Sequence, residues 1–487
     1  MLPRRAIAPV TLAALVAVPG VFVAACGDDP PLGVEGSSDT QDGGGATDDV
    51  QVAAPPGIPE TTIDPCRGQP LPEGDHYVPP GMCARLVSAR VPGLRQLTFA
   101  PNGDLFGVTG NEIFLFRDVD GDGFFTREEI TSWAETGGGG AGNNCHIDVE
   151  GGFLYAGSAR GVKRFSYAPG QDKGDEGEDV VVGQPTGGHG RRTVRVYDGF
   201  LYVDSGSAGN ATNETSTSEY DTKRSLIKRF DLSKFVPGTP FQWDEGENVT
   251  VGLRNPNGFV RNEITKKMYA VVNGLDNQRY KGADVHDDNP GEQVVEIAPG
   301  KKYGYPFCFT AQRVLSNGRD GTLVPPGTQL VNAGFPGNPH DDGWCAANSD
   351  KPTTFVQAHS APLDIVFFDL QPRGALPEKW RGGAFIALHG SWNRSTPTGY
   401  KVVWQPFNPD GSAPMPTSTE TTTTFPYEVV FGGGDASGPK DGAWSWAAET
   451  GEGEAPRPAG VAISPIDGAL YIASDQSGFL YRVGLKR

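Results

Sequence analysis

The sequence predicts an all-β fold, a six-bladed β-propeller. Its 487 residues include 68 Gly and 41 Pro and show no long run of helical periodicity, which favours short strands joined by turns. One theme, a turn followed by an apolar strand that ends in small residues, recurs at 102–108, 152–157, 199–204, 267–272, 383–388 and 468–473. Six copies of one strand unit indicate radial closure, with a pair of β-sandwiches as the alternative.

Several of the copies continue into a second strand, for example at 161–165 and 478–483, as a strand–turn–strand unit requires. The spacing is uneven between Gly274 and Gly383, where long insertions separate two copies. In a propeller the loops at one end of the blades surround the central channel. We therefore expect functional residues to come from separate blades, far apart in the sequence.

The N-terminus predicts an exported, lipid-anchored protein. Arg4 and Arg5 precede an apolar run that ends at Ala25, and a small-residue cleavage site is followed by Cys26. This resembles a bacterial lipoprotein signal over 1–26, with Cys26 lipidated on the periplasmic face or the cell surface; an ordinary secretory signal is the alternative. Residues 27–60 are rich in Gly, Asp, Ser and Pro and predict a disordered tether. The propeller is expected over 61–487.

The net charge of −18 excludes nucleic acid as a partner, because phosphate binding needs concentrated Lys and Arg. A neutral substrate and a calcium ion remain compatible with this charge. No Cys-x-x-Cys-His haem attachment site is present in the sequence.

Five cysteines remain after Cys26, and an exported protein can oxidise them. Cys308 and Cys345 flank an irregular insertion, so we pair them. Cys66 and Cys83 flank the start of the folded domain and are paired as well. Cys145 is left as a buried thiol, although the sequence does not determine the connectivity.

Residues 118–129 match the loop of an EF-hand. Carboxylates at alternate positions repel one another unless a cation lies among them, and a glycine at the sixth position permits the sharp turn. The predicted calcium ligands are Asp118, Asp120, Asp122, Phe124 (through its carbonyl), Thr126 and Glu129. No second EF-hand is evident, so the ion is expected to be structural; an acidic surface turn is the alternative.

Several further segments carry a family resemblance through their sequences and through their order and spacing along the chain. They are GLRNPNG at 252–258, NGLD at 273–276, YGYP at 303–306, GGHGRRT at 187–193, AHSAPL at 358–363, ALHGSWNR at 387–394 and RPAGVA at 457–462. Together they resemble the glucose/sorbosone dehydrogenase family of quinoprotein six-bladed propellers, and the 387–394 run is most similar to the sorbosone dehydrogenase branch. The resemblance covers most of the chain from about Val91 onward.

The resemblance implies oxidation of a sugar, or of a sugar-derived aldehyde or alcohol, by pyrroloquinoline quinone with calcium. His189 matches the family's catalytic base, and Arg254 matches the arginine that stabilises negative charge on a quinone carbonyl. The backbone carbonyls of Asn273, Gly274 and Leu275 match the loop that holds the calcium ion. The remaining matches to cofactor contacts are Asn257, Arg457 and, more loosely, Asn393 and Arg394.

Two positions depart from the family pattern. Ser207 stands where the glucose-oxidising members carry an aspartate that orients the histidine, and Ala459 stands where they carry a second arginine. Two other functions therefore stay open, a non-catalytic propeller that binds carbohydrate or protein, and a calcium-dependent hydrolase. The hydrolase would need several acidic side chains in the channel, where His189, Arg254, Asn273 and Arg457 are expected instead. His359 and His389 are expected only to form hydrogen bonds between blades.

Overall fold

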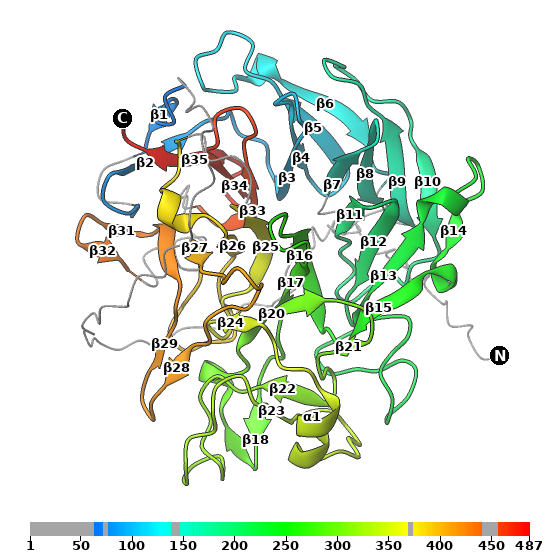
Figure 1. Cartoon of the computed structure of the whole chain (residues 1–487), viewed down its shortest axis with the longest axis vertical. Helices are drawn as coiled ribbons and strands as arrows, with labels where there is room; N and C mark the ends of the chain where they lie inside the picture. Colours follow the sequence, from blue (N-terminus) through cyan, green and yellow to red (C-terminus); the bar gives the residue numbers. More distant parts are fainter. Residues whose placement is uncertain (1–62, 72–75, 138–146, 159, 369–373, 441–455) are drawn as a thin grey trace, which may run out of the picture.

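The structure, a computed structural model, describes residues 63–71, 76–137, 147–158, 160–368, 374–440 and 456–487 (Figure 1). Six antiparallel sheets are arranged as a ring around a central axis, which confirms the predicted six-bladed β-propeller. Residues 1–62, which contain the predicted signal, Cys26 and the tether, lie outside the described residues, as does Cys145. Within the described residues, no helix is long and apolar enough to cross a membrane.

Each blade is a four-stranded core sheet whose strands follow one another from the axis outward. Blades one to three are β3 (Gln96–Phe99), β4 (Leu105–Val108), β5 (Glu112–Phe116), β6 (Ile130–Glu135); β7 (Ile147–Glu150), β8 (Phe153–Ser158), β9 (Gly161–Ser166), β10 (Glu178–Val182); and β11 (Val194–Tyr197), β12 (Phe200–Ser205), β13 (Leu226–Asp231), β15 (Glu247–Val251). Blades four to six are β16 (Asn255–Arg261), β17 (Met268–Asn273), β20 (Glu292–Ile297), β24 (Thr354–Val356); β25 (Pro362–Phe367), β26 (Ala384–Leu388), β27 (Lys401–Gln405), β30 (Glu428–Gly432); and β33 (Pro458–Ile463), β34 (Leu470–Ser474), β35 (Leu480–Leu485), β2 (Met82–Leu86).

The last blade closes the ring, because it combines both ends of the propeller. β2, from the start of the folded chain, pairs antiparallel with β35 near the C-terminus, with Met82 opposite Leu485. β1 (Gln69–Pro70) extends this sheet, and the predicted Cys66–Cys83 disulfide lies beside it and is confirmed. Pairing the two ends of the chain in one sheet removes the open edge that an unclosed propeller would expose.

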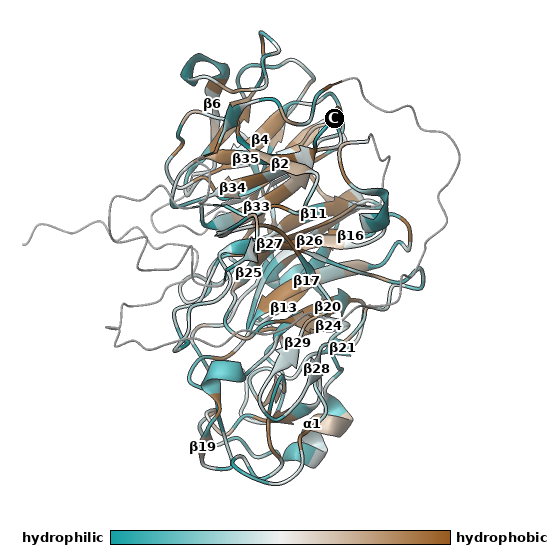
Figure 2. Ribbon diagram, turned by 90° about the vertical axis from the view of Figure 1, so that its left-hand side faces the viewer, coloured by the Kyte–Doolittle hydropathy of each residue, from teal (hydrophilic) through white to brown (hydrophobic). Residues whose placement is uncertain are grey.

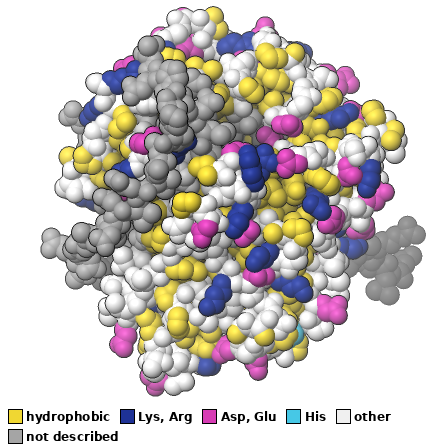
Figure 3. Space-filling view, in the orientation of Figure 1, with side chains coloured by type: hydrophobic (Ala, Val, Ile, Leu, Met, Phe, Trp, Pro, Cys, Tyr) yellow, Lys and Arg dark blue, Asp and Glu magenta, His cyan; other side chains and the backbone are white. Residues whose placement is uncertain are grey.

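Six hydrophobic clusters each fill one interface between neighbouring blades. Phe106 of β4, for example, packs with Leu154 of β8, whereas Leu97 of β3 packs with Tyr471 of β34. Figure 2 shows this distribution, with hydrophobic residues on the strands and hydrophilic residues on the connecting loops. Lys and Arg side chains alternate with Asp and Glu over the face seen in Figure 3.

The insertion predicted after Gly274 forms a projection beside the fourth blade, at the bottom of Figure 1. Its small elements are β18 (Arg279–Tyr280), β19 (Ala283–Asp284), β22 (Cys308–Thr310), β23 (Gln329–Val331) and α1 (Asp342–Asn348). The predicted Cys308–Cys345 disulfide joins β22 to α1 and is confirmed. Because Cys308 also lines a pocket next to Asn273, this projection forms one wall of the candidate site.

The remaining elements are short and lie at the edges of blades or in connecting loops. They are β14 (Phe241–Gln242), β21 (Lys301–Lys302), β28 (Thr417–Ser418), β29 (Thr423–Thr424), β31 (Gly434–Asp435), β32 (Gly438–Pro439) and the 3-10 turns Arg127–Glu129, Leu232–Lys234, Trp243–Glu245, His286–Asp288 and Glu378–Trp380.

Candidate functional site

The candidate site lies at the end of the propeller where the innermost strands begin. Arg254 directly precedes β16, and His189 and His359 precede β11 and β25 by a few residues. Asn273 is the last residue of β17, the second strand of its blade. Because successive strands of a blade run antiparallel, the start of a first strand and the end of a second strand lie at the same end of the sheet. This geometry brings loops from three neighbouring blades together, and functional residues from separate blades were expected from the sequence.

One pocket contains four of the predicted residues. It has about 400 Å³ of empty space, part of it open to solvent. Its lining residues are His189, Arg254, Asn255, Asn273, Gly274, Asp276, Glu292, His359, Ala361 and Trp392. The structure therefore places the predicted base, the predicted cation and part of the predicted calcium loop around one cavity, which we call the histidine pocket.

The hydrogen bonds of His189 determine which of its ring nitrogens carries hydrogen. Nδ1 lies 2.9 Å from Oγ of Ser207, and this hydroxyl donates its hydrogen to the carbonyl of Gly209 at 2.8 Å. A serine hydroxyl has only one hydrogen, so toward His189 it acts as an acceptor. Nδ1 of His189 is therefore the protonated nitrogen, and Nε2 keeps its lone pair. Ser207 thus accepts the hydrogen bond of His189 Nδ1 at the position where the family resemblance led us to expect an aspartate.

The pKa of His189 lies well below 6.5, because burial disfavours the imidazolium and the positive charges of Arg254 and Arg191 disfavour it further. The backbone also holds the ring in place, since the His189 N–H donates to Ser207 O at 2.9 Å. His189 is consequently a neutral imidazole at neutral pH, with a fixed tautomer.

Arg254 is buried, with 7 % of its surface exposed, and is held by two of its three guanidinium nitrogens. Nε donates to the carbonyl of Asn210 at 3.1 Å, and Nη2 contacts the carboxylate of Asp276 at 2.5 Å. Nη1 forms no hydrogen bond with any residue that the structure describes. The side chain is thus rigidly positioned and still has donor capacity at the pocket.

Two carboxyl groups that the sequence analysis did not assign also line the histidine pocket. Asp276 ends the NGLD segment and was quoted without a role, whereas Glu292 opens β20 and belongs to no recognisable motif. Glu292 Oε2 accepts a hydrogen bond from Gly274 N at 2.6 Å. Burial raises the pKa of Glu292 to about 8, although the Gly274 hydrogen bond and the charge of Arg254 act in the opposite direction. The spacing of 18 residues across a strand pair is visible only in the fold.

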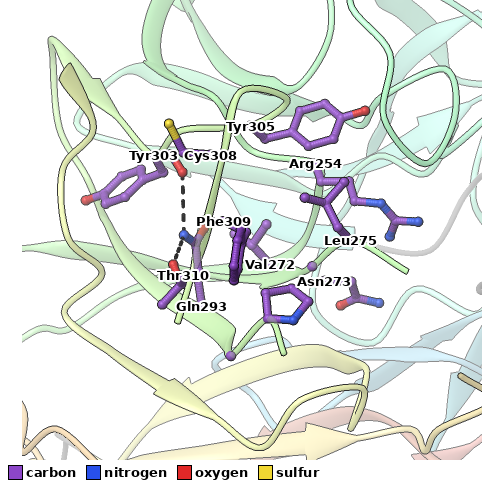
Figure 4. Close-up of a pocket in the computed structure, with 13 residues that line it drawn as sticks. Arg254, Val272, Asn273, Leu275, Gln293, Tyr303, Tyr305, Cys308, Phe309 and Thr310 are labelled. Carbon is purple, nitrogen blue, oxygen red and sulfur yellow. Dashed lines mark hydrogen bonds between the residues drawn. The ribbon is translucent and has the colours of Figure 1, made fainter. Parts of the chain in front are cut away.

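A second pocket of about 290 Å³ shares Arg254, Asn273 and Gly274 with the first (Figure 4). Leu275 lines this second pocket and not the histidine pocket. Its other wall comes from the insertion and includes Tyr303, Tyr305, Cys308, Phe309 and Thr310. Figure 4 shows Gln293 between them, with Nε2 donating to Thr310 Oγ1 at 2.6 Å. The 273–275 loop therefore separates a polar pocket from a more aromatic one.

Asn257 does not line either of these two pockets. It is 1 % exposed, and its Nδ2 donates to Oδ1 of Asn273 and to the carbonyl of Asn255, each at 3.1 Å. Asn255 lines the histidine pocket instead, and its Oδ1 is buried without a hydrogen-bond partner among the described atoms. The structure thus gives Asn257 a positioning geometry and places Asn255 at the cavity.

The loosely matched pair Asn393 and Arg394 also contacts protein groups rather than the histidine pocket. Asn393 forms two hydrogen bonds with Asn277, one to its backbone at 2.9 Å and one to its side chain at 2.8 Å. Arg394 lies 3.5 Å from the carboxylate of Asp288, and its Nη1 is buried without a partner among the described atoms. Their neighbour Trp392 does line the pocket.

Arg457 belongs to a charged cluster between the fifth and sixth blades. Its Nε donates to the carbonyl of His389 at 3.1 Å, and His389 Nε2 lies 3.0 Å from the carboxylate of Asp475. Asp475 also forms an ion pair with Arg95 at 2.7 Å. Burial, together with the charge of Arg457, lowers the pKa of His389 to about 3. His389 thus forms the hydrogen bond between blades that the sequence predicted.

The predicted EF-hand loop lies between β5 and β6, on the rim of the first blade. Oxygen atoms of Asp118, Asp120 and Glu129 lie within 4.8 Å of one another. Asp122 lies outside this group of three, and its carboxylate accepts a hydrogen bond from Phe124 N at 2.7 Å. Thr126 donates its hydroxyl to Glu129 Oε2 at 2.9 Å. Three of the predicted side-chain ligands thus converge.

The same loop touches the closure of the ring. Phe125 exchanges backbone hydrogen bonds with Val87 and Ala89, each at 2.8 Å, in the segment that leads from β2 to β3. Arg67, next to the Cys66–Cys83 disulfide, donates to Gly121 O at 2.5 Å and lies 3.4 Å from Asp118. Calcium in this loop would therefore tie the first blade to the segment that closes the last one.

A family model described as TrAA12-like matches residues 77–486 of the chain. Among curated proteins, the pyrroloquinoline quinone-dependent pyranose dehydrogenase of Coprinopsis cinerea is 28% identical over 365 residues, which are 71% of this chain and 47% of that protein. The chain therefore spans about half the length of this relative. The pyrroloquinoline quinone-dependent sugar dehydrogenase of Hypocrea jecorina is 26% identical over 323 residues, 63% of this chain and 71% of that protein.

Solved structures agree with the fold over most of the chain. The holo form of the pyranose dehydrogenase PQQ domain from Coprinopsis cinerea has a TM-score of 0.70 at 26% identity, covering 86% of this chain and 99% of that one. A calcium structure of Trichoderma reesei family AA12 has a TM-score of 0.69 at 23% identity, covering 85% and 98%, and supports the fold alone. The predicted resemblance to the family of pyrroloquinoline quinone-dependent sugar dehydrogenases is thus confirmed, whereas the assignment to the sorbosone branch stays a prediction.

Proposed function

The chain belongs to the TrAA12-like family, and we propose that it is a quinoprotein dehydrogenase that oxidises a sugar with pyrroloquinoline quinone and calcium. A sugar-derived aldehyde is a second substrate of the same chemical class. The observation that carries the proposal is the fixed tautomer of His189, whose Nε2 lone pair belongs to a pocket that also contains a buried arginine. A proton acceptor beside a cation is what oxidation of an alcohol to a carbonyl requires.

The residues present fit the cofactor. Pyrroloquinoline quinone is a flat, anionic molecule with two adjacent carbonyl groups, so it needs hydrogen-bond donors and a cation. Arg254 has an uncommitted Nη1 at the pocket, and Trp392 offers a partly exposed ring that suits stacking on a planar molecule. A bound quinone would supply the acceptor for the hydride of the substrate carbon, and the residues of this chain would hold it and handle the proton.

Calcium would be held by the backbone carbonyls of the 273–275 loop. β17 ends at Asn273, so the carbonyls of Gly274 and Leu275 leave the sheet ladder and are available as ligands. Asp276 adds negative charge near the same loop, which suits a hard cation, and the Glu292 carboxyl accepts a hydrogen bond from Gly274 N and so holds the loop in place. Arg457, Asn257, Asn393 and Arg394 hold the surroundings of the site and stay candidates for cofactor contacts.

The protein's own residues perform the proton transfer. Nε2 of His189 takes the proton of the substrate hydroxyl, while Nδ1–H stays hydrogen-bonded to Ser207. Because Ser207 is a neutral acceptor, it stabilises the resulting imidazolium only weakly. Arg254, fixed by Asn210 and Asp276, stabilises the negative charge that develops next to the reacting carbon. Ala459 supplies no second arginine, so Arg254 would be the main side chain to offset the negative charge of a bound cofactor.

The test is a titration of the purified protein with pyrroloquinoline quinone in calcium, followed by ultraviolet–visible absorption. We expect stoichiometric binding, reduction of the cofactor on addition of an aldopyranose, and binding without reduction in His189→Ala. Absence of binding in the parent would refute the proposal and favour a non-catalytic propeller that binds carbohydrate or protein.

We further propose that the 118–129 loop binds a structural calcium ion and that the protein is exported and anchored through Cys26. The two disulfides support export, because they form and persist in oxidising compartments. An external acceptor would take the electrons from the reduced cofactor. Metabolic labelling with palmitate tests the anchor: the label should be lost in Cys26→Ala, and its persistence would refute lipidation at this residue.

A further inference from the structure

His359 has a fixed tautomer of its own. Its Nε2 lies 2.7 Å from the backbone carbonyl of His286, and a carbonyl oxygen only accepts hydrogen bonds. The hydrogen must therefore sit on Nε2, which leaves Nδ1 with a lone pair. His359 is therefore the opposite tautomer to His189, in which Nδ1 carries the hydrogen.

Nδ1 of His359 is open to the histidine pocket. His359 is 6 % exposed and is one of the residues that line that pocket. Nδ1 has no hydrogen-bond partner among the described residues. Because it is also absent from the set of fully buried polar atoms without a partner, this nitrogen is accessible. The pocket thus contains two unprotonated imidazole nitrogens, with the guanidinium of Arg254 in the same lining.

The backbone holds this arrangement at a cost. His359 has φ 62° and Ala361 has φ 50°, both in the left-handed region that residues with a side chain rarely adopt, and both line the pocket. Hydrogen bonds around the turn maintain it, since Ser360 donates both its N–H, at 3.1 Å, and its hydroxyl, at 2.7 Å, to Gln357 O. Such a conformation persists where the surrounding contacts require the side chain in one place.

We propose that His359 is a specificity-determining residue whose Nδ1 accepts a hydrogen bond from a second hydroxyl of the sugar, beside the hydroxyl that His189 deprotonates. This inference rests on the proposed function. A lone pair needs a donor as its partner, and an anionic quinone offers chiefly oxygen acceptors. A pyranose carries hydroxyls on adjacent carbons and can donate to both histidines at once. The substrate class is therefore a pyranose with neighbouring free hydroxyls.

Two conservative substitutions separate this role from a structural one. In His359→Gln, the terminal amide reaches the position of Nε2 and keeps the donor to His286 O, but no acceptor remains at the Nδ1 position. In His359→Asn, the side-chain oxygen takes the position of Nδ1, while the donor to His286 is lost. Asn also tolerates positive φ better than most residues, so this variant is expected to fold.

The experiment measures D-glucose, D-galactose, D-mannose and their monodeoxy analogues as substrates of the cofactor-loaded enzyme. We expect His359→Gln to raise KM about tenfold with little change in kcat, the effect of one lost hydrogen bond, whereas His359→Asn stays close to the parent. A deoxy analogue that lacks the contacting hydroxyl should have a lower kcat/KM than the intact sugar in the parent but not in His359→Gln. The other deoxy analogues should lose as much kcat/KM in His359→Gln as in the parent.

A binding measurement gives a readout that does not depend on turnover. In the inert His189→Ala background, calorimetric titration with the preferred sugar should show about tenfold weaker binding when His359→Gln is added. A purely structural His359 predicts the reverse pattern, with Gln neutral and Asn impaired, and that result would overturn the inference while the proposed function stands. A parent that neither binds the cofactor nor oxidises any sugar would overturn both.

Discussion

Replacing Ser207 by Ala tests whether a serine can orient the catalytic histidine. The substitution removes the acceptor 2.9 Å from His189 Nδ1 and leaves the neighbouring backbone bonds, such as Ser207 N to Arg254 O at 2.8 Å, in place. A buried donor left without its partner costs about 1–3 kcal/mol. The imidazole avoids that cost by turning or by moving its hydrogen to Nε2, and either change removes the free lone pair from the pocket.

The magnitude follows from the same range. A free-energy cost of about 1–3 kcal/mol corresponds to a decrease in kcat of roughly 5- to 150-fold. Affinity for pyrroloquinoline quinone should be unchanged, because Ser207 does not line the histidine pocket. His189→Ala should have a larger effect, since a general base contributes about 100- to 10,000-fold.

The assay is steady-state reduction of an electron-accepting dye with a fixed sugar, together with cofactor titration of each variant. Ser158→Ala is the matched control: this buried serine ends β8 in the neighbouring blade, its hydroxyl accepts a hydrogen bond from Gly161 N at 3.2 Å, and it lines neither pocket. Full activity in Ser207→Ala would refute the assignment of the tautomer to Ser207. An equal loss in Ser158→Ala would show that the effect is a general disturbance of the fold.

Three further predictions use other parts of the structure. The decrease in kcat/KM caused by protonation of His189 should begin only below pH 6.5, because a base whose pKa is lowered stays neutral until the pH drops through that pKa. A decrease that His189→Ala abolishes and that is centred at or above pH 6.5 would contradict the burial of His189. Calcium at 100 times its Kd should stabilise the parent by about 2.7 kcal/mol and raise its melting temperature, and Asp120→Ala should lose this gain. The exposed control Asp320→Ala should keep it. Equal calorimetric curves with and without chelator in the parent would rule out an ion in the loop. Asp475→Asn should lower the unfolding free energy by about 3 kcal/mol in urea titrations, because it leaves the buried Arg95 without its carboxylate, and an unchanged midpoint would argue against that ion pair.

The parts of the fold that could be predicted are those with a local signal. The six repeats recognised in the sequence correspond to the second strands of the blades, β4, β8, β12, β17, β26 and β34. These strands are buried on both faces between neighbouring blades, so they read as continuous apolar runs; β26 and β34 are buried at every position. The outer strands have an exposed face, as in β6, and their mixed sequences resemble those of loops.

The site was predicted only in part, for a related reason. His189 and Arg254 stand in glycine-rich motifs that mark tight turns, and these motifs can be recognised along the chain. Glu292 has an ordinary position at the start of a strand, and its carboxyl reaches Gly274 only because β17 and β20 pair. His359 was assigned to a hydrogen bond between blades, which it does form, but its second ring nitrogen faces the pocket.

The sequence by itself indicated the propeller class and the number of blades, since one strand pattern recurs six times, and it located the EF-hand-like loop by its spacing of carboxylates. It suggested both disulfide pairings, which the structure then confirmed. Only the tertiary structure decided what the polar side chains do. A hydroxyl or an imidazole can donate or accept, and its role depends on which partners surround it. Gly209 and the carbonyl of His286 make that choice for Ser207 and His359. Gly209 is a local partner two residues from Ser207, but the His189 ring that Ser207 orients is 18 residues away, and His286 is 73 residues from His359. Only the folded blades bring these separated groups together.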